Sequence, residues 1–248
     1  MHDQNRFAAA LDSLEPLGKG LGVSLNASQW QQLARFLSSL ADYNSHTNLV
    51  AKGDPESLAK DHVLDSLTLV PYIGRSARGR LIDIGAGGGF PGIVLAIAMP
   101  EMAVTLVDSV GKKTSFLTQV LSELDMSQRV TVLTARAEEV GHREDYRNKF
   151  DFATARAVGR FDMVCELALP LIKVGGEVLL QKSARQARED EAAAAACLPK
   201  LGGELLATEI PDSQILGKDV VIMRIKSVRP ADGKYPRPWP KIKSSPLC

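Results

Sequence analysis

The sequence predicts an α/β fold built on a mostly parallel sheet. From residue 80 onward, seven short runs of β-branched and aliphatic residues recur, and stretches with helical periodicity separate most of them. A glycine-rich segment, DIGAGGGFPG at 83–92, directly follows the first run. Strands that alternate with helices form parallel sheets covered on both faces. We therefore expect a seven-stranded, mostly parallel sheet domain preceded by a helical extension.

The composition is that of an ordinary globular protein. The chain has 248 residues, 45% of them hydrophobic, and 30 Lys and Arg against 29 Asp and Glu, so total charge neither indicates nor excludes nucleic acid. The widely spaced Cys165, Cys197 and Cys248 predict no zinc site or disulfide framework, and we expect the first two to be buried. Because no signal peptide or membrane-length apolar run is present, we expect a cytoplasmic protein.

Residues 1–75 are expected to form the N-terminal helical extension. In the segment 26–44, apolar residues follow one helical stripe, with Trp30, Leu33 and Phe36 as core residues and Asn26 or Ser28 as the cap. A second helix is expected to start at Asp54-Pro55-Glu56 and to stop near Pro71. The polar segment 43–53 between them is expected to form turns.

The sheet domain is expected to span residues 76–228. Its predicted strands lie at 80–85, 103–109, 129–135, 151–158, 176–182, 203–210 and 219–227, and its helices at 91–99, 112–124, 138–141, 163–172 and 186–200. No helix is expected between the last two strands, which indicates a strand inserted antiparallel at the edge. Residues 229–248 are basic and proline-rich, and we expect a C-terminal tail or extended arm.

The glycine-rich loop is expected to border a cofactor cleft, because it follows the first strand at the carboxyl edge of the sheet. Gly87, Gly89 and Gly92 formally match a dinucleotide fingerprint. The pattern Asp83, Gly85, Gly87, Gly89 instead favours S-adenosylmethionine, since the Asp83 carboxylate suits a cationic ligand better than a pyrophosphate. The two last strands also resemble the end of a seven-stranded methyltransferase sheet. A loop with packing duties alone remains a further alternative.

Two acids after later strands are candidate cofactor ligands. Asp108 ends the second strand, where its carboxylate can accept both ribose hydroxyls. Glu138 follows the third strand, where the backbone N–H of Ala137 or Glu138 can read the adenine edge. The alternatives are that Asp108 caps the next helix and that Glu138 is the first acid of a short helix.

Six segments resemble the glucose-inhibited division protein B family: HVLDSL (62–67), DIGAGGGFPGIVLAI (83–97), LVDSVGKKTSFL (106–117), RAEEV (136–140), DFATARAV (151–158) and KYPR (234–237). The resemblance runs from about residue 40 to the tail. It implies a class I S-adenosylmethionine-dependent methyltransferase with a Rossmann-like sheet, acting on guanine N7 in bacterial 16S ribosomal RNA or the small ribosomal subunit.

The resemblance also implies site residues. The cofactor-contacting positions of the family fall on Gly85, Phe90, Ala137, Glu138 and Arg156, and the general fold adds Asp83, Gly87 and Asp108. The tail departs from the family, which more often has lysine and glycine after YPR. No catalytic residue is assigned, because guanine N7 has a free lone pair and needs no deprotonation. Arg156 is expected to position the cofactor, O6 or a phosphate, or alternatively to pair with a nearby acid.

Several cations are candidates for binding RNA phosphates around the cleft. They are Lys112, Lys113, Lys182, Arg185 and Arg237. Tyr235 and Trp239 in the tail are candidates for stacking on bases, and solvated side chains are the alternative. His62, Asp65 and Ser66 lie within one helical turn, and we expect them to fix the extension to the sheet domain rather than to face the cleft.

Other functions remain open on the sequence alone. A methyltransferase of the same fold can act on a small molecule or a protein, and the glycines also allow an NAD-dependent oxidoreductase. A non-catalytic RNA-binding assembly factor is a third possibility. Nothing in the sequence asks for more than a monomer.

Overall fold

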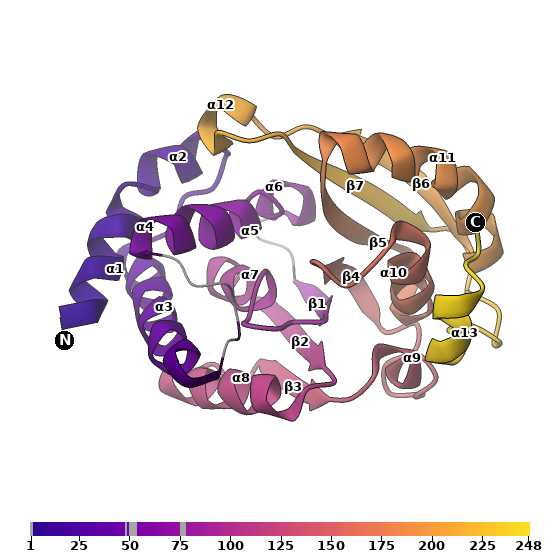
Figure 1. The fold of residues 1–248 in the computed structure, drawn as a ribbon, viewed down its shortest axis with the longest axis horizontal. Coiled ribbons are helices and arrows are strands. Elements are labelled where there is room, and N and C mark those ends of the chain that lie inside the picture. The colour runs from indigo at the N-terminus through magenta and orange to yellow at the C-terminus, as the bar shows by residue number, and fades with distance from the viewer. Residues whose placement is uncertain (1, 48, 50–53, 75–77) are drawn as a thin grey trace.

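A seven-stranded sheet forms the centre of the computed structural model, which describes residues 2–47, 49, 54–74 and 78–248. The strand order is β3-β2-β1-β4-β5-β7-β6 (Figure 1). The strands are β1 (Gly79–Ile84), β2 (Met102–Asp108), β3 (Val130–Thr134), β4 (Phe150–Ala155), β5 (Ile172–Ser183), β6 (Gly203–Glu209) and β7 (Val220–Ser227). Neighbours from β3 to β5 are parallel, and β7 runs antiparallel to β5 and β6. The predicted seven-stranded, mostly parallel sheet is confirmed.

Helices cover both faces of the sheet and bury two apolar cores. On one face lie α3 (Ala27–Thr47), α7 (Gly92–Ala98) and α8 (Gly111–Glu123), and on the other lie α10 (Phe161–Ala168) and α11 (Ala184–Leu201). Side chains of a strand alternate between the faces, so Leu81 joins the first core whereas Ile82 and Ile84 join the second.

Two helices after β4 differ from the prediction. The helix predicted at 163–172 ends at Ala168, because Pro170 falls in a 3₁₀ turn, Leu169–Leu171, that leads directly into β5. A four-residue helix, α12 (Ser213–Leu216), stands where none was expected, and Asp212 caps it. The expected antiparallel insertion is confirmed, because β7 lies between β5 and β6 and runs antiparallel to both.

The N-terminal extension consists of short helices around α3. They are α1 (His2–Asp12), α2 (Glu15–Gly20), α4 (Pro55–Leu58), the π-helical turn η1 (Ala59–Leu64), α5 (Asp65–Leu67) and α6 (Val70–Ile73). Asn26 accepts the Gln29 N–H at 2.9 Å and Asp54 that of Ser57 at 2.8 Å, so both capping predictions hold. Pro71 does not stop the second helix as predicted, because it fits the first turn of α6.

The expected turn segment 43–53 is partly helical, since α3 continues to Thr47. Its positions 48 and 50–53 lie outside the described residues. Leu33 and Phe36 are fully buried as predicted, whereas Trp30 is partly exposed.

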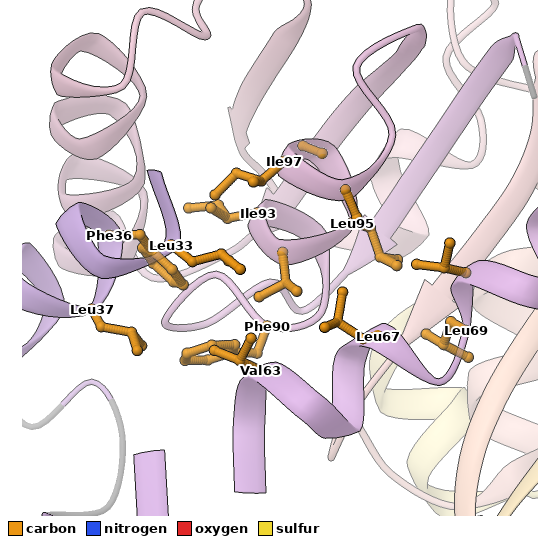
Figure 2. Close-up of a cluster of buried hydrophobic side chains, with 14 of the residues drawn as sticks. Leu33, Phe36, Leu37, Val63, Leu67, Leu69, Phe90, Ile93, Leu95 and Ile97 are labelled. Atoms are coloured by element: carbon orange, nitrogen blue, oxygen red, sulfur yellow. The ribbon is translucent and has the colours of Figure 1, made fainter. Parts of the chain in front are cut away.

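The extension packs directly on the glycine-rich loop. Figure 2 shows Phe90 of the loop and Ile93 of α7 among Leu33 and Phe36 of α3 and Val63 of η1. The ring centres of Phe36 and Phe90 lie 5.1 Å apart. Because α7 begins directly after the loop, this apolar packing holds the loop from the side of the extension.

Residues 229–248 fold back on the sheet domain. Within them α13 (Trp239–Ser244) lies near α9 (Ala137–Val140) and α10 (Figure 1). Tyr235 and Ile242 are buried in the second core. The domain boundaries at 75/76 and 228/229 stay predictions, and the first lies within positions 75–77, which are outside the described residues.

Cys165 and Cys197 are buried, as predicted. Among the described residues, no helix combines the length and apolar character needed to cross a membrane. The same residues contain no group of three or more His, Cys, Asp or Glu side chains arranged to hold a metal ion.

Candidate active site

The glycine-rich loop adopts backbone angles that favour glycine. Gly85 has φ of +71° and Gly87 has φ of +55°. A Cβ at Gly85 would also lie 2.7 Å from Cγ2 of Val158, so backbone strain and crowding both disfavour a side chain there. At Gly87 the nearest atom to such a Cβ is a carbonyl oxygen at 3.7 Å, so at this position only the backbone angle favours glycine.

A pocket opens at the carboxyl edge of the sheet, beside this loop. Its lining includes four of the predicted cofactor residues: Gly85, Asp108, Ala137 and Glu138. The other lining residues are Ile84, Val107, Ser109, Val110, Lys113, Ala135, Arg136, Ala157, Val158, Leu167 and Trp239. The ends of four neighbouring strands thus contribute to one site, as expected for a ligand cleft of an open α/β sheet.

Asp108 holds the glycine-rich loop and the start of α8 together. Its Oδ2 accepts the Gly87 N–H at 3.0 Å, and its Oδ1 accepts the Val110 N–H at 2.9 Å. Lys113 Nζ lies 3.9 Å from Oδ2. Each carboxylate oxygen can accept more than one hydrogen bond. Capping the next helix and accepting ligand hydroxyls, which the sequence presented as alternatives, are therefore compatible.

The opposite side of the pocket is formed by the first turn of α9. Ala137 and Glu138 stand there, and N–H groups in a first helical turn lack intrahelical acceptors. Leu167 of α10 and Trp239 of α13 add apolar surface. Leu167 was not predicted as a site residue, because no sequence motif distinguishes it from other apolar residues of its helix. Trp239 was predicted only as a residue that stacks on bases.

Asp83 lies beneath the loop. It is not among the described residues that line this pocket. The side chain is fully buried, and its Oδ2 accepts the Gly92 N–H at 2.9 Å. Thr154 Oγ1 donates to Oδ1 at 3.2 Å. Burial raises the pKa of Asp83 to about 7, although these two hydrogen bonds and the charge of Arg156 oppose the shift. Asp83 therefore braces the start of α7.

Replacing Asp83 with asparagine should flatten part of the pH dependence of stability. The pKa of Asp83 is 3.8 in the unfolded reference and about 7 in the fold, so its stabilising contribution is complete at low pH and is lost as pH rises through 7. The asparagine side chain stays neutral throughout this range. Relative to the wild type, the variant should gain about 1 kcal/mol in unfolding free energy between pH 6 and 8. Urea unfolding at both pH values measures this; a pH-independent difference would contradict it.

Four of the residues singled out in the sequence gather with Lys218 on the extension side of the loop, and we call this group the Arg156 cluster. It consists of His62, Asp65, Phe90, Arg156 and Lys218, and no sequence pattern indicated Lys218. Arg156 Nη2 lies 3.0 Å from His62 Nδ1, and Nη1 lies 3.5 Å from Asp65 Oδ2. Lys218 Nζ lies 3.0 Å from Asp65 Oδ1. The guanidinium carbon is 5.2 Å from the Phe90 ring centre.

The Arg156 cluster joins three parts of the chain. His62 and Asp65 belong to the extension, Arg156 follows β4, and Lys218 precedes β7. Gln181 of β5 adds a bond of 2.6 Å to the Asp65 carbonyl. The contacts agree with the expectation that His62 and Asp65 fix the extension to the sheet domain. Phe90 and Arg156 thus lie apart from the described pocket around Asp108.

The candidate RNA-binding cations all have partners. Lys112 Nζ donates to the Thr47 carbonyl at 3.0 Å, Lys182 pairs with Asp190 at 2.9 Å, and Arg185 pairs with Glu189 at 3.0 Å. The exposed pair of Arg185 is weak and can yield to a phosphate. Arg237 differs, because its partner Glu166 is only 1% exposed. Its ion pair indicates a structural role, and contact of any of these cations with RNA stays a prediction.

Comparison with known proteins gives a consistent result. A family model described as GidB, rRNA small subunit methyltransferase G, matches residues 29–210. A ribosomal RNA small subunit methyltransferase G from Alkaliphilus oremlandii is 35% identical over 95% of this chain and 98% of its own. The protein of the same name from Roseiflexus sp. (strain RS-1) is 39% identical over 92% and 95%.

Solved structures support the fold. A candidate transferase from Pyrococcus horikoshii superimposes with a TM-score of 0.51 and 14% identity, covering 65% of this chain and 63% of its own. At that identity the likeness shows a shared fold and nothing more.

Proposed function

The chain belongs to the GidB family of ribosomal RNA small subunit methyltransferases, and on this premise we propose that it methylates N7 of one guanine in 16S ribosomal RNA. It is a methyltransferase that uses S-adenosylmethionine. The structural observation that carries the proposal is Asp108, whose carboxylate ends β2 in a pocket bordered by the glycine-rich loop. A carboxylate in this position suits the two ribose hydroxyls of the cofactor.

The residues of the site fit S-adenosylmethionine better than a dinucleotide. A dinucleotide places its pyrophosphate at the N-terminus of the helix after the first strand. Here the Asp83 carboxyl group already accepts the Gly92 N–H at the start of that helix, α7. A pyrophosphate would meet this acidic group in place of the Gly92 N–H donor. This argues against the NAD-dependent oxidoreductase alternative.

The chain contributes binding and alignment to the proposed reaction. Bound S-adenosylmethionine supplies an electrophilic methyl group. Asp108 and the first turn of α9 hold the nucleoside, while the loop at Gly85 lies against the cofactor. N7 already has a lone pair, so the protein needs to align the base and exclude water rather than to remove a proton. No residue is therefore assigned as a general base.

Ribosomal RNA is the proposed partner, and Lys112, Lys113, Lys182 and Arg185 are the proposed phosphate contacts. The Arg185–Glu189 pair is exposed and is of the kind that solvent and salt screen effectively, so a polyanion can displace it without leaving a buried carboxylate unpaired. The Lys113 and Lys182 side chains are only 30% and 13% exposed, so a phosphate has to compete there with Asp108 and Asp190. We also propose that the protein acts as a monomer in the cytoplasm, where ribosomal RNA is modified.

Methyl transfer can be measured with tritiated S-adenosylmethionine, using 16S RNA and small subunits from cells that lack the enzyme. We expect label at a single guanine, located by strand cleavage at N7-methylguanine. RNA from cells that contain the enzyme is the matched control and should accept no label. Tight cofactor binding without label in either form of the RNA would discard the ribosomal proposal and favour a small molecule, a protein or a non-catalytic role.

A further inference from the structure

The hydrogen-bond partner of His62 shows which ring nitrogen carries the proton. Arg156 Nη2 lies 3.0 Å from His62 Nδ1. A guanidinium has only donors, so Nδ1 must be the acceptor and carries no proton. In the neutral ring the proton is then on Nε2, which becomes a hydrogen-bond donor. Among the residues that the structure describes, His62 Nε2 has no hydrogen-bond partner.

The His62 ring is also fixed in orientation. It stacks on Phe90 of the glycine-rich loop, with ring centres 4.8 Å apart and planes 27° apart. Phe90 is in turn buried against Phe36 of α3. Stacking sets the plane of the imidazole and the bond from Arg156 sets its rotation within that plane. The Nε2–H donor therefore has a fixed direction.

The surroundings of His62 keep the ring neutral. Burial, and after it the charge of Arg156, lower the pKa of His62 to about 4. Lys218 acts in the same direction, whereas Asp61 and Asp65 oppose the shift. At neutral pH the ring therefore offers a hydrogen bond without a positive charge. Methylation at N7 makes the guanine ring cationic, and a neutral donor does not oppose that charge.

We propose that His62 is the base-recognition residue, whose Nε2–H donates to O6 of the acceptor guanine and leaves N7 free for the methyl group. The inference rests on the proposed function. His62 lies where the glycine-rich loop, through Phe90, meets Arg156 at the carboxyl end of β4. Ligands of open α/β folds bind beyond this edge. O6 and N7 are neighbouring acceptors on guanine, so a donor to O6 positions N7 without blocking it.

Two substitutions at His62 separate base recognition from support of Arg156. In His62→Asn, the amide oxygen can take the place of Nδ1 and accept from Arg156, but nothing reaches the position of Nε2. In His62→Gln, the longer side chain can place an N–H donor near the position of Nε2. If His62 donates to the base, the Asn variant should lose about 10-fold in single-turnover methyl transfer and the Gln variant less.

A change in the RNA provides the second arm of the experiment. In the RNA, the guanine that accepts the methyl group is replaced by 2-aminopurine, which keeps N7 and lacks O6. The wild-type protein should slow about 10-fold on this RNA, whereas His62→Asn should show no further loss. Such non-additivity reports a contact between His62 and O6, which a purely structural role would not produce.

Cofactor affinity and the unfolding temperature of each variant complete the test. Equal rates for wild type and His62→Asn, with equal loss on 2-aminopurine RNA, would overturn the inference and leave methylation by the wild type standing. A loss of S-adenosylmethionine affinity that accounts for the whole rate change would assign His62 to the cofactor and also overturn it. Absence of N7 methylation by the wild type would overturn the proposed function together with this inference.

Discussion

Replacing Arg237 with alanine is expected to lower the free energy of unfolding by about 3–5 kcal/mol, because it leaves a buried charge without its partner. Glu166 Oε1 accepts from Nε of Arg237 at 2.7 Å, and Oε2 accepts from Nη2 at 2.6 Å. The side chain of Glu166 is 1% exposed and that of Arg237 is 14% exposed. The Ala variant retains only the bond from the backbone N–H of residue 237, at 2.9 Å in the wild type.

Urea unfolding at pH 7 measures the effect, and the tail offers a matched control. Lys234 lies three residues earlier and pairs with Asp232 at 3.8 Å, with both side chains more than half exposed. Lys234→Ala should change the unfolding free energy by less than about 0.5 kcal/mol. Adding Glu166→Gln to Arg237→Ala removes the unpaired charge and should restore part of the loss. Equal effects of Arg237→Ala and Lys234→Ala would show that the ion pair does not hold the tail.

The Arg237 pair also connects the tail to the cofactor pocket. Trp239, which lines that pocket, lies two residues after Arg237. Releasing the segment should therefore weaken cofactor binding as well as stability. If Arg237 instead acts mainly on RNA phosphates, its substitution would lower RNA affinity while the unfolding free energy stays unchanged.

Features that depend on neighbouring residues could be predicted from the sequence. The strand before the glycine-rich loop, the caps at Asn26 and Asp54, and Asp108 at the end of β2 all follow from local patterns. Since parallel strands share one carboxyl edge, the sequence also predicted that Gly85, Asp108, Ala137 and Glu138 lie in one pocket.

Features that depend on distant pairing could not be predicted. Arg237 and Glu166 are 71 residues apart, and Arg156 and His62 are 94 residues apart. Nothing in a basic tail distinguishes an arginine that reaches a buried acid from one that stays in solvent.

Replacing Asp108 with alanine should weaken S-adenosylmethionine binding by about 100-fold. A carboxylate that accepts two ribose hydroxyls contributes roughly 2–3 kcal/mol, which corresponds to about that change in affinity. The substitution also removes the acceptor of the Gly87 and Val110 N–H groups, so the loop loses an anchor at the same time. Both effects act in the same direction, and isothermal titration calorimetry measures their sum.

A carboxylate at the other end of the strands, where their amino ends lie, is the matched control for this experiment. Asp151 Oδ2 likewise accepts a backbone N–H, that of Arg80 at 2.8 Å, near the amino ends of β1 and β4. Asp151→Ala should lower stability without changing cofactor affinity, because Asp151 does not line the pocket. Unchanged affinity in Asp108→Ala would remove Asp108 from the ribose site. Equal losses in both variants would show that sheet stability, and not a direct contact, controls binding.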